Sequence, residues 1–208
     1  MAAQAKKRWR DHYTDKARQA GFAARSVFKL EEIDRRLGLV RPGLKVLDLG
    51  ASPGSWTQYA LQRLAGSGHL VAVDLKPLHG VGAHPRLTFL EGDIFEFSAE
   101  ELQGGPEPFD LILSDMAPAT IGSRTADTLR SAALCERVVD VADACLRPGG
   151  GLLLKLLEGQ GTAQLRSRLK TDYASLRAFR PDATRKASSE TFLYALKPES
   201  SGGKGSEG

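Results

Sequence analysis

The sequence has little cysteine, few aromatic residues and no long apolar run. Only two of its 208 residues are cysteine, and aromatic residues make up 7%. No apolar stretch approaches the roughly 20 residues that a membrane span needs. The first basic residues, at positions 6–10, are followed by polar sequence and not by the apolar core of a signal peptide. The sequence therefore predicts a cytoplasmic protein with no membrane association.

The two cysteines and four histidines do not form a metal-binding pattern. Cys135 and Cys145 lie ten residues apart without a Cys-x-x-Cys pair, which argues against a structural zinc ion or a disulfide framework. We expect both to be reduced residues of a helix. No metal site is expected, and the histidines are predicted to lie on the surface or in loops: His12, His69, His79 and His84.

The basic charge is concentrated near the two ends of the chain. Residues 1–29 carry a net charge of +6 and residues 166–186 a net charge of +5, whereas residues 30–165 carry −6. Aromatic residues are interleaved with the first basic block. This combination suits phosphate contacts and base stacking, so nucleic acid is the leading partner. The alternative is that the basic N-terminal arm is only a solvated tail.

Apolar strand signals alternate with helical periodicity along most of the chain. Alternation of strands that are apolar throughout with helices predicts an α/β fold with a mostly parallel sheet covered on both faces. Two later strands, 175–180 and 191–196, would form an antiparallel hairpin at the edge of the sheet. The other predicted strands are 45–49, 70–74, 87–90, 109–115 and 151–156, and the predicted helices are 26–37, 55–65, 126–146 and 161–172.

A glycine turn at residues 48–56 follows the first predicted strand and opens a helix. Its Gly-x-x-x-Gly spacing is neither the Gly-x-Gly-x-x-Gly of dinucleotide binding nor a phosphate loop, which disfavours NAD, FAD and ATP. Acidic residues follow other strands at the edge where ligands of such sheets bind. Asp74 is placed to hold ribose hydroxyls, Asp93 an adenine amino group, and Asp115 the aminoacyl end of a ligand. S-adenosyl-L-methionine fits this pattern.

Four stretches resemble the FtsJ/RrmJ (RlmE-type) ribose 2′-O-methyltransferases, in the right order and over nearly the whole chain. They are Ser-Val-Phe-Lys-Leu-Glu-Glu-Ile at 26–33, the segment 46–56, Ser-Asp-Met-Ala-Pro at 114–118 and Ser-Ser-Glu at 188–190. The resemblance implies a Rossmann-like fold that uses S-adenosyl-L-methionine. It also implies methylation of a uridine ribose in 23S ribosomal RNA, at the stage of the assembled large ribosomal subunit.

The resemblance also assigns site residues and domain limits. It implies a basic extension at 1–25, a catalytic domain at 26–197 that acts as a monomer, and a disordered tail at 198–208. Ser55 and Ala119 depart from the family pattern, which often has Gly and Asn there. The implied catalytic tetrad is Lys29, Asp115, Lys155 and Glu190, and the implied cofactor residues are Gly54, Trp56, Asp74, Asp93 and Asp115.

The two lysines differ in what their local sequence indicates. Lys29 precedes two glutamates on a predicted helix, a pattern that also fits a solvated ion pair. Lys155 interrupts a run of leucines, where burying a lysine is unfavourable unless it serves a function. We therefore expect Lys155 to be the central catalytic group, oriented by Lys29 and Glu190. Trp56 could instead simply cover the core.

Alternatives to this function differ in substrate or in chemistry. A dinucleotide-dependent oxidoreductase conflicts with the glycine spacing. A non-catalytic RNA-binding protein on the same scaffold would be indicated by loss of tetrad residues, and all four are present. A ribose 2′-O-methyltransferase acting on tRNA remains open, because related enzymes share the tetrad.

Overall fold

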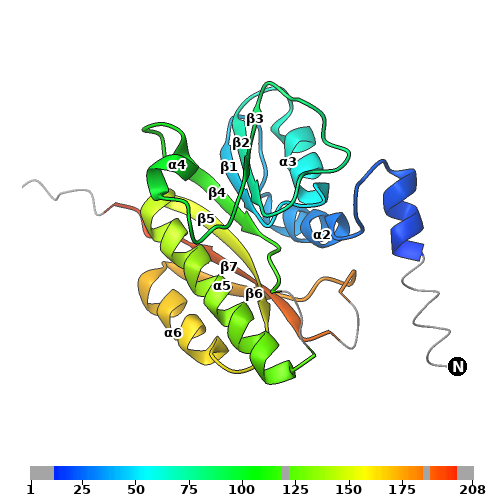
Figure 1. Cartoon of the computed structure of the whole chain (residues 1–208). Coiled ribbons are helices and arrows are strands. Elements are labelled where there is room, and N and C mark those ends of the chain that lie inside the picture. The colour runs from blue at the N-terminus through cyan, green and yellow to red at the C-terminus, as the bar shows by residue number, and fades with distance from the viewer. Residues whose placement is uncertain (1–11, 119–121, 185–187, 201–208) are drawn as a thin grey trace, which may run out of the picture.

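The computed structural model describes residues 12–118, 122–184 and 188–200. The basic residues Lys6, Lys7, Arg8 and Arg10, the departure at Ala119 and most of the predicted tail lie outside the described residues. Within them, seven strands form one sheet in the order β3-β2-β1-β4-β5-β7-β6 (Figure 1). The strands are β1 (Lys45–Leu49), β2 (His69–Asp74), β3 (Leu87–Glu91), β4 (Phe109–Ser114), β5 (Leu146–Leu157), β6 (Ser175–Phe179) and β7 (Glu190–Leu196).

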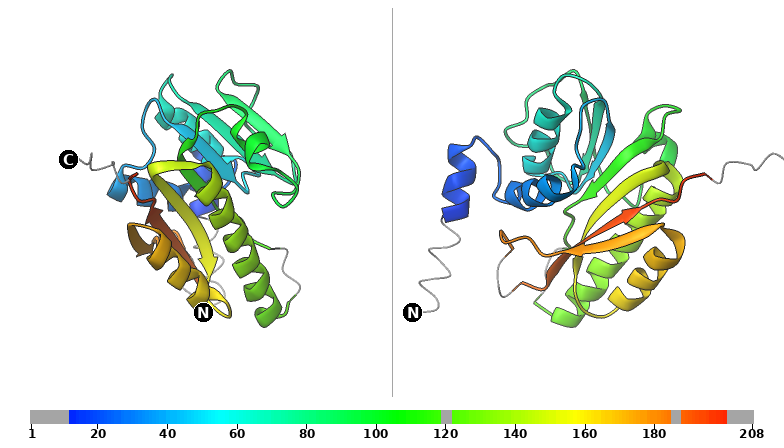
Figure 2. Two further views of the ribbon diagram at one scale, coloured as in Figure 1. Left: turned by 90° about the vertical axis from the view of Figure 1, so that its left-hand side faces the viewer. Right: turned by 180° about the vertical axis from the view of Figure 1, so that it is seen from behind.

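Strands β1 to β5 are parallel, and β7 is antiparallel to both β5 and β6. The mostly parallel sheet and its antiparallel hairpin are therefore confirmed. The helices cover both faces (Figures 1 and 2). They are α2 (Val27–Leu37), α3 (Ser55–Leu64), α4 (Ala99–Gln103), α5 (Arg124–Cys145) and α6 (Thr162–Asp172).

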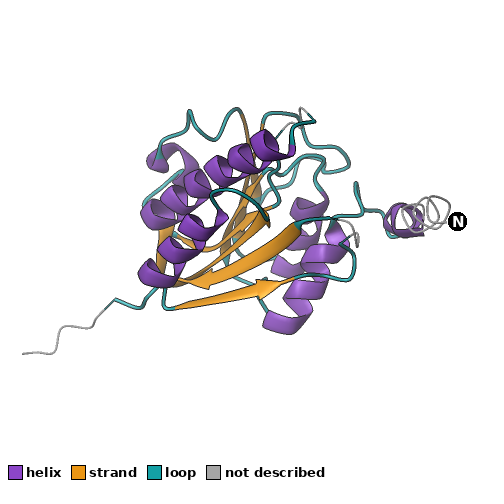
Figure 3. Ribbon diagram, turned by 90° about the horizontal axis from the view of Figure 1, so that it is seen from below, coloured by secondary structure: helices purple, strands orange, loops and turns teal. Residues whose placement is uncertain are grey.

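Figure 3 shows helices on both sides of the sheet. Two clusters of apolar side chains, one on each face, hold the helices to the sheet. Alternation along each strand sends neighbouring side chains to opposite faces. In β1, Val46 packs with α2 and α3, whereas Leu47 and Leu49 pack with α5. Cys135 and Cys145 are buried, free cysteines of α5, as predicted.

Strand β5 begins earlier than expected. The sequence predicts a strand from residue 151 after a Pro-Gly-Gly helix stop, but β5 starts at Leu146, directly after α5. Phe109 pairs with Leu146 and Leu111 pairs with Gly151, so the intervening residues form an irregularity in the ladder. Proline and glycine are tolerated in a strand at such bulges, which explains the difference.

Two helical segments were not predicted. Residues 12–19 are helical, and α4 is a five-residue helix. Helix α4 begins with a capping box, in which Ser98 accepts a hydrogen bond from the Glu101 amide and the Glu101 carboxylate accepts one from the Ser98 amide. Its Ser-x-x-Glu spacing was a readable signal for that helix.

Candidate active site

The candidate site lies at the carboxyl ends of the parallel strands. A cavity of about 790 Å³ is bordered by the residues that follow β1, β2, β3 and β4, and by one face of α5. Of the predicted cofactor residues, Asp74, Asp93 and Asp115 line this cavity, whereas Gly54 and Trp56 do not. The structure therefore brings three predicted carboxylates to one hollow.

The glycine turn after β1 needs glycine at two positions. Gly50 has φ +76°, and a Cβ there would collide with the side chain of Met116, which follows β4 and packs directly against the turn. Gly54 has φ +114°, and a Cβ would come within 2.9 Å of Val81 Cγ2. Both φ values lie where side chains are disfavoured. Gly54 thus shapes the turn from below, without bordering the cavity itself.

Asp74 ties the glycine turn to the end of β2. Its Oδ2 accepts a hydrogen bond from the Ser52 amide at 2.9 Å, and its Oδ1 accepts one from the Lys76 amide at 2.9 Å. Each carboxylate oxygen can accept a further hydrogen bond. Asp74 can therefore hold the turn and still bind a pair of hydroxyl groups in the cavity.

The opposite rim of the cavity combines an acidic residue with apolar side chains. Asp93 follows β3, and its Oδ1 accepts a hydrogen bond from the Phe95 amide at 3.1 Å. Phe95 and Leu75 line the same cavity and are 55% and 66% exposed. A flat, partly apolar ligand with a polar edge, such as a nucleobase, suits such a rim.

Two buried lysines lie beside the cavity, each paired with a carboxylate. Lys155 Nζ donates to Asp115 Oδ1 at 2.7 Å and to the backbone oxygen of Asp115. Lys29 Nζ donates to Glu190 Oε2 at 2.9 Å. The residues Lys29 and Lys155 are 8% and 6% exposed, so Lys29 is not the solvated lysine that its local sequence allows.

Strand alternation explains how these four residues meet. Leu154 and Leu156 of β5 pack toward α5, so Lys155 between them faces the side of the sheet that α2 covers. Lys29 lies in the first turn of α2, and Glu190 begins β7, next to β5 in the sheet. The predicted tetrad therefore comes from four separated segments that converge at one place.

The two lysine–carboxylate pairs interact electrostatically. Burial alone would raise the pKa of Glu190, but its ion pair with Lys29, the charge of Lys155 and a hydrogen bond with Ser188 lower it overall. Because Lys155 acts on a carboxylate bound to Lys29, the four residues form one charge cluster. Glu190 is consequently held as a carboxylate.

Trp56 is a buried residue that packs beneath the site without bordering the cavity. It is 2% exposed, its ring lies 5.8 Å from that of Phe192, and its Nε1 donates to the Ser26 backbone oxygen at 2.9 Å. The Ser26 and Ser55 hydroxyls are 2.8 Å apart. These contacts fix the start of α2 to the glycine turn, which places Lys29 near the cavity. The geometry supports the core-covering interpretation of Trp56.

Asp48, in β1, is buried directly beneath the turn. It is 1% exposed, and its Oδ2 accepts a hydrogen bond from Thr57 Oγ1 at 2.7 Å. Burial raises the pKa of Asp48 to about 7, against the effect of the Thr57 hydrogen bond and with smaller contributions from Asp115 and Asp74. A carboxyl group whose pKa is close to neutral pH thus lies beneath the glycine turn that borders the cavity.

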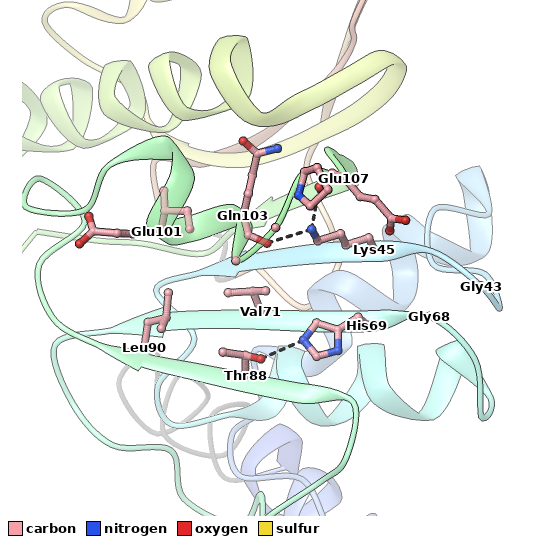
Figure 4. Close-up of a pocket in the computed structure, with 14 residues that line it drawn as sticks. Gly43, Lys45, Gly68, His69, Val71, Thr88, Leu90, Glu101, Gln103 and Glu107 are labelled. Carbon is pink, nitrogen blue, oxygen red and sulfur yellow. Dashed lines mark hydrogen bonds between the residues drawn. The ribbon is translucent and has the colours of Figure 1, made fainter.

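A second cavity, of about 430 Å³, lies at the opposite end of the strands (Figure 4). Three of its polar side chains form hydrogen bonds within the protein: Lys45 Nζ donates to the backbone oxygens of Gln103 and Glu107, and His69 Nε2 lies 2.9 Å from Thr88 Oγ1. None of the predicted site residues lines it. The chemistry therefore centres on the first cavity.

The second basic block divides into two parts. In α6, Arg168 pairs with four carboxylates of α5 and α6, and Arg166 pairs with Glu158. The loop between β6 and β7 instead packs on the N-terminal part of the chain, where Ala183 contacts a cluster with Ala17 and Phe28. Among the residues that the structure describes, Ala183 of this loop brings the second block beside the helix at 12–19, which belongs to the first block.

The residues described contain no group of three or more His, Cys, Asp or Glu side chains arranged to hold a metal ion. In the same part of the chain, each helix is too short or too polar to cross a lipid bilayer.

Comparisons with known proteins identify the family of this chain. The family model described as FtsJ-like methyltransferase matches residues 22–198. The chain is 46% identical over 185 residues to a protein of Desulfatibacillum aliphaticivorans, covering 89% of each chain. It is also 46% identical over 192 residues to a protein of Sorangium cellulosum, covering 92% of this chain and 90% of that one. Both are named Ribosomal RNA large subunit methyltransferase E.

Solved structures show the same fold. A Plasmodium falciparum protein described as a ribosomal RNA methyltransferase superposes with a TM-score of 0.70 at 23% identity, over 86% of this chain and 98% of that one. Human methyltransferase-like protein 13, solved in complex with SAH, gives a TM-score of 0.58 at 17% identity over 78% and 75% of the two chains. The Rossmann-like methyltransferase fold predicted from the sequence is confirmed.

Proposed function

Because the chain belongs to the FtsJ-like methyltransferase family, we propose that it methylates the 2′-hydroxyl of a uridine ribose in 23S ribosomal RNA with S-adenosyl-L-methionine. The proposed substrate is the RNA within the assembled large ribosomal subunit. The observation that carries the proposal is the pair of Lys155 and Asp115, because Asp115 lines the cofactor cavity and binds a buried lysine through two of its atoms.

The residues around the cavity fit the proposed cofactor. Three carboxylates line it, which suits a ligand with two cationic groups, ribose hydroxyls and an adenine amino group. Asp74 would bind the ribose hydroxyls, and Asp93 the adenine amino group. Gly54 and Trp56 would act indirectly, by shaping the turn and fixing α2. Bound S-adenosyl-L-methionine would supply an electrophilic methyl group.

The tetrad would prepare the ribose hydroxyl for attack. A 2′-hydroxyl is a weak nucleophile at neutral pH, so it must lose its proton as the new bond to carbon forms, and its oxygen must point at the methyl group. Lys155, held by Asp115, would contact this hydroxyl. It would either accept the proton or stabilise the negative charge that develops on the oxygen as the proton leaves. Lys29 and Glu190 would orient Lys155 and the ribose from the α2 side.

The pairing of basic side chains in this chain supports the assembled subunit as the proposed substrate. In α6, Arg168 pairs with carboxylates of α5 and α6, and Arg166 pairs with Glu158, so these two cations offer little to a phosphate backbone. Recognition would then depend on the shape of a large folded RNA together with the N-terminal basic block. Such a substrate would place the protein in the cytoplasm, and we propose that it acts as a monomer.

Transfer of a labelled methyl group tests the proposal. Purified large ribosomal subunits, free 23S RNA and tRNA would each be incubated with enzyme and labelled cofactor. We expect efficient labelling of subunits, weaker labelling of free 23S RNA and none of tRNA. The labelled nucleotide should resist alkaline cleavage at its 3′ side, because a methylated 2′-oxygen cannot attack the phosphate.

Other outcomes would support the alternatives. Labelling of tRNA alone would identify a tRNA methyltransferase. RNA binding without any transfer would indicate a non-catalytic RNA-binding protein, and a methyl group on the base would contradict the ribose chemistry.

A further inference from the structure

Asp48 is a buried carboxyl group, and its hydrogen bonds within the protein satisfy only part of it. Thr57 satisfies one carboxylate oxygen, but Oδ1 is buried and has no hydrogen-bond partner among the described residues. A buried carboxylate with an unsatisfied oxygen is unfavourable, whereas a hydrophobic side chain of similar size would avoid that cost.

The charged groups that act on Asp48 are two more carboxylates. Asp74 approaches from the end of β2, and Asp115 from the segment after β4, while α3 contributes only the neutral Thr57 hydroxyl. Asp74 and Asp115 both line the cofactor cavity. Asp48 is therefore close enough to two cavity carboxylates that a positive charge entering the cavity would stabilise its ionised form.

We propose that Asp48 is a proton-linked residue of the cofactor site, which releases its proton to solvent when the cationic groups of S-adenosyl-L-methionine enter the cavity. The proposal rests on the cofactor assigned under the proposed function. In the free protein, burial and the two neighbouring carboxylates favour neutral Asp48. In the complex, the positive sulfonium and ammonium groups favour the carboxylate, so binding and deprotonation strengthen each other.

The reaction product offers an internal comparison. Transfer of the methyl group converts the sulfonium of the cofactor into a neutral thioether, which removes one positive charge from the cavity. S-adenosyl-L-homocysteine should therefore release less proton on binding than S-adenosyl-L-methionine does. Reprotonation of Asp48 after transfer would then favour departure of the product.

Calorimetry in buffers of different ionisation enthalpy measures this coupling. Binding would be followed at about pH 6.5, below the pKa of about 8 of the α-amino group of the ligand. We expect release of about half a proton per S-adenosyl-L-methionine bound to the wild-type protein, and a smaller release when S-adenosyl-L-homocysteine binds. Between about pH 5.5 and 7.5, wild-type affinity should rise about three- to tenfold more than that of Asp48→Asn.

Asp48→Asn and His79→Gln form the decisive pair of variants. Asparagine can still accept the Thr57 hydrogen bond but cannot titrate, so proton release should vanish in Asp48→Asn. His79 is exposed, and the hydrogen bond that ties it to the glycine turn runs from its backbone amide to the Pro53 oxygen, so a change of its side chain leaves that bond in place. His79→Gln should therefore keep the coupling of the wild type.

Each remaining outcome separates this proposal from the proposed function. Cofactor binding without proton release, or release that disappears only in His79→Gln, would overturn the role of Asp48 and leave the cofactor assignment intact. A wild-type protein that binds neither ligand would overturn the cofactor assignment and the coupling with it. If Asp48→Asn does not fold, ¹³C NMR of the wild-type aspartate carboxyl groups must show one deprotonating on cofactor addition.

Discussion

Lys155 and Lys29 are both buried, but they differ in what they contact. Lys155 donates to two atoms of Asp115, a residue that borders the cavity where the methyl group would be held. Lys29 donates to Glu190, which does not line that cavity. The contacts therefore favour Lys155 as the group next to the reacting hydroxyl, with Lys29 one step further away.

Lys155→Ala should lower the single-turnover rate of methyl transfer at least about 10²-fold, the range of a positioned acid–base group, while both ligands still bind. Lys155→Arg should not restore the rate, because guanidinium is planar and stays protonated. Lys197→Ala is the matched control, since Lys197 caps the end of α5 through backbone oxygens of Ala142, Asp143 and Leu146. A wild-type rate in Lys155→Ala would contradict the mechanism.

Asp74→Ala should weaken S-adenosyl-L-methionine binding by roughly 1.5–3 kcal/mol, the cost of hydrogen bonds lost to a charged group. Part of that loss would come from the Ser52 amide, which Asp74 also binds. Asp110→Ala removes a carboxylate that pairs with Arg147 away from the cavity and should leave affinity unchanged. Calorimetry on both variants decides the matter, and equal affinities for the two would exclude Asp74 from the site.

At the scale of elements, the positions of most strands could be predicted because these strands are short, largely apolar and followed by a turn signal, whereas the early start of β5 at Leu146 could not. Lys155 and Asp115 were readable for the same reason, as polar residues within or directly after a buried run. The helix at 12–19 was not, because its sequence is polar and its stability comes from packing of Ala17 with Phe28 and with Ala183, which is far along the chain.

The parts of the site that could not be predicted depend on side-chain pairing in space. Sequence spacing does not show that Arg168 would face four carboxylates, or that Trp56 would pack on Phe192 beneath the cavity. It also gives no sign that Asp48, unlike Asp74, would be fully enclosed. These facts follow from how helices dock on the sheet, which local patterns do not encode.

The glycine turn allows a test at the same scale. Gly50→Ala places a methyl group against Met116 at a φ of +76°, so it should narrow the cavity and weaken cofactor binding more than tenfold, about 1.4 kcal/mol. Gly21→Ala has the same φ but nothing within 4 Å of the added methyl group. It should cost about 1 kcal/mol of stability and no affinity. Similar affinities in the two variants would show that close approach at Gly50 is not needed.

At the scale of the whole molecule, the helix at 12–19 and the loop between β6 and β7 meet beside the tetrad. The helix at 12–19 packs on the first turn of α2, next to Lys29, and on Ala183 in the loop that leads to Glu190. The amide of Asp182 in this loop also donates to Glu32 Oε2 of α2 at 2.7 Å. The helix at 12–19, which follows the basic residues in sequence, therefore lies close to the place where the RNA ribose would be bound.

Replacing the basic residues that precede this helix with alanine should weaken RNA binding at all sequences alike, because contacts with phosphates carry no base specificity. Each phosphate contact releases counterions when RNA binds. Loss of these contacts should therefore make the slope of log affinity against log salt concentration shallower by up to about 3 units. Cofactor affinity should not change. Arg168→Gln, which removes a cation already paired with carboxylates, should leave the slope as it is once melting curves confirm folding. A salt titration that gives the wild-type slope for the N-terminal variant would show that the block does not contact RNA. The residues replaced are Lys6, Lys7, Arg8 and Arg10.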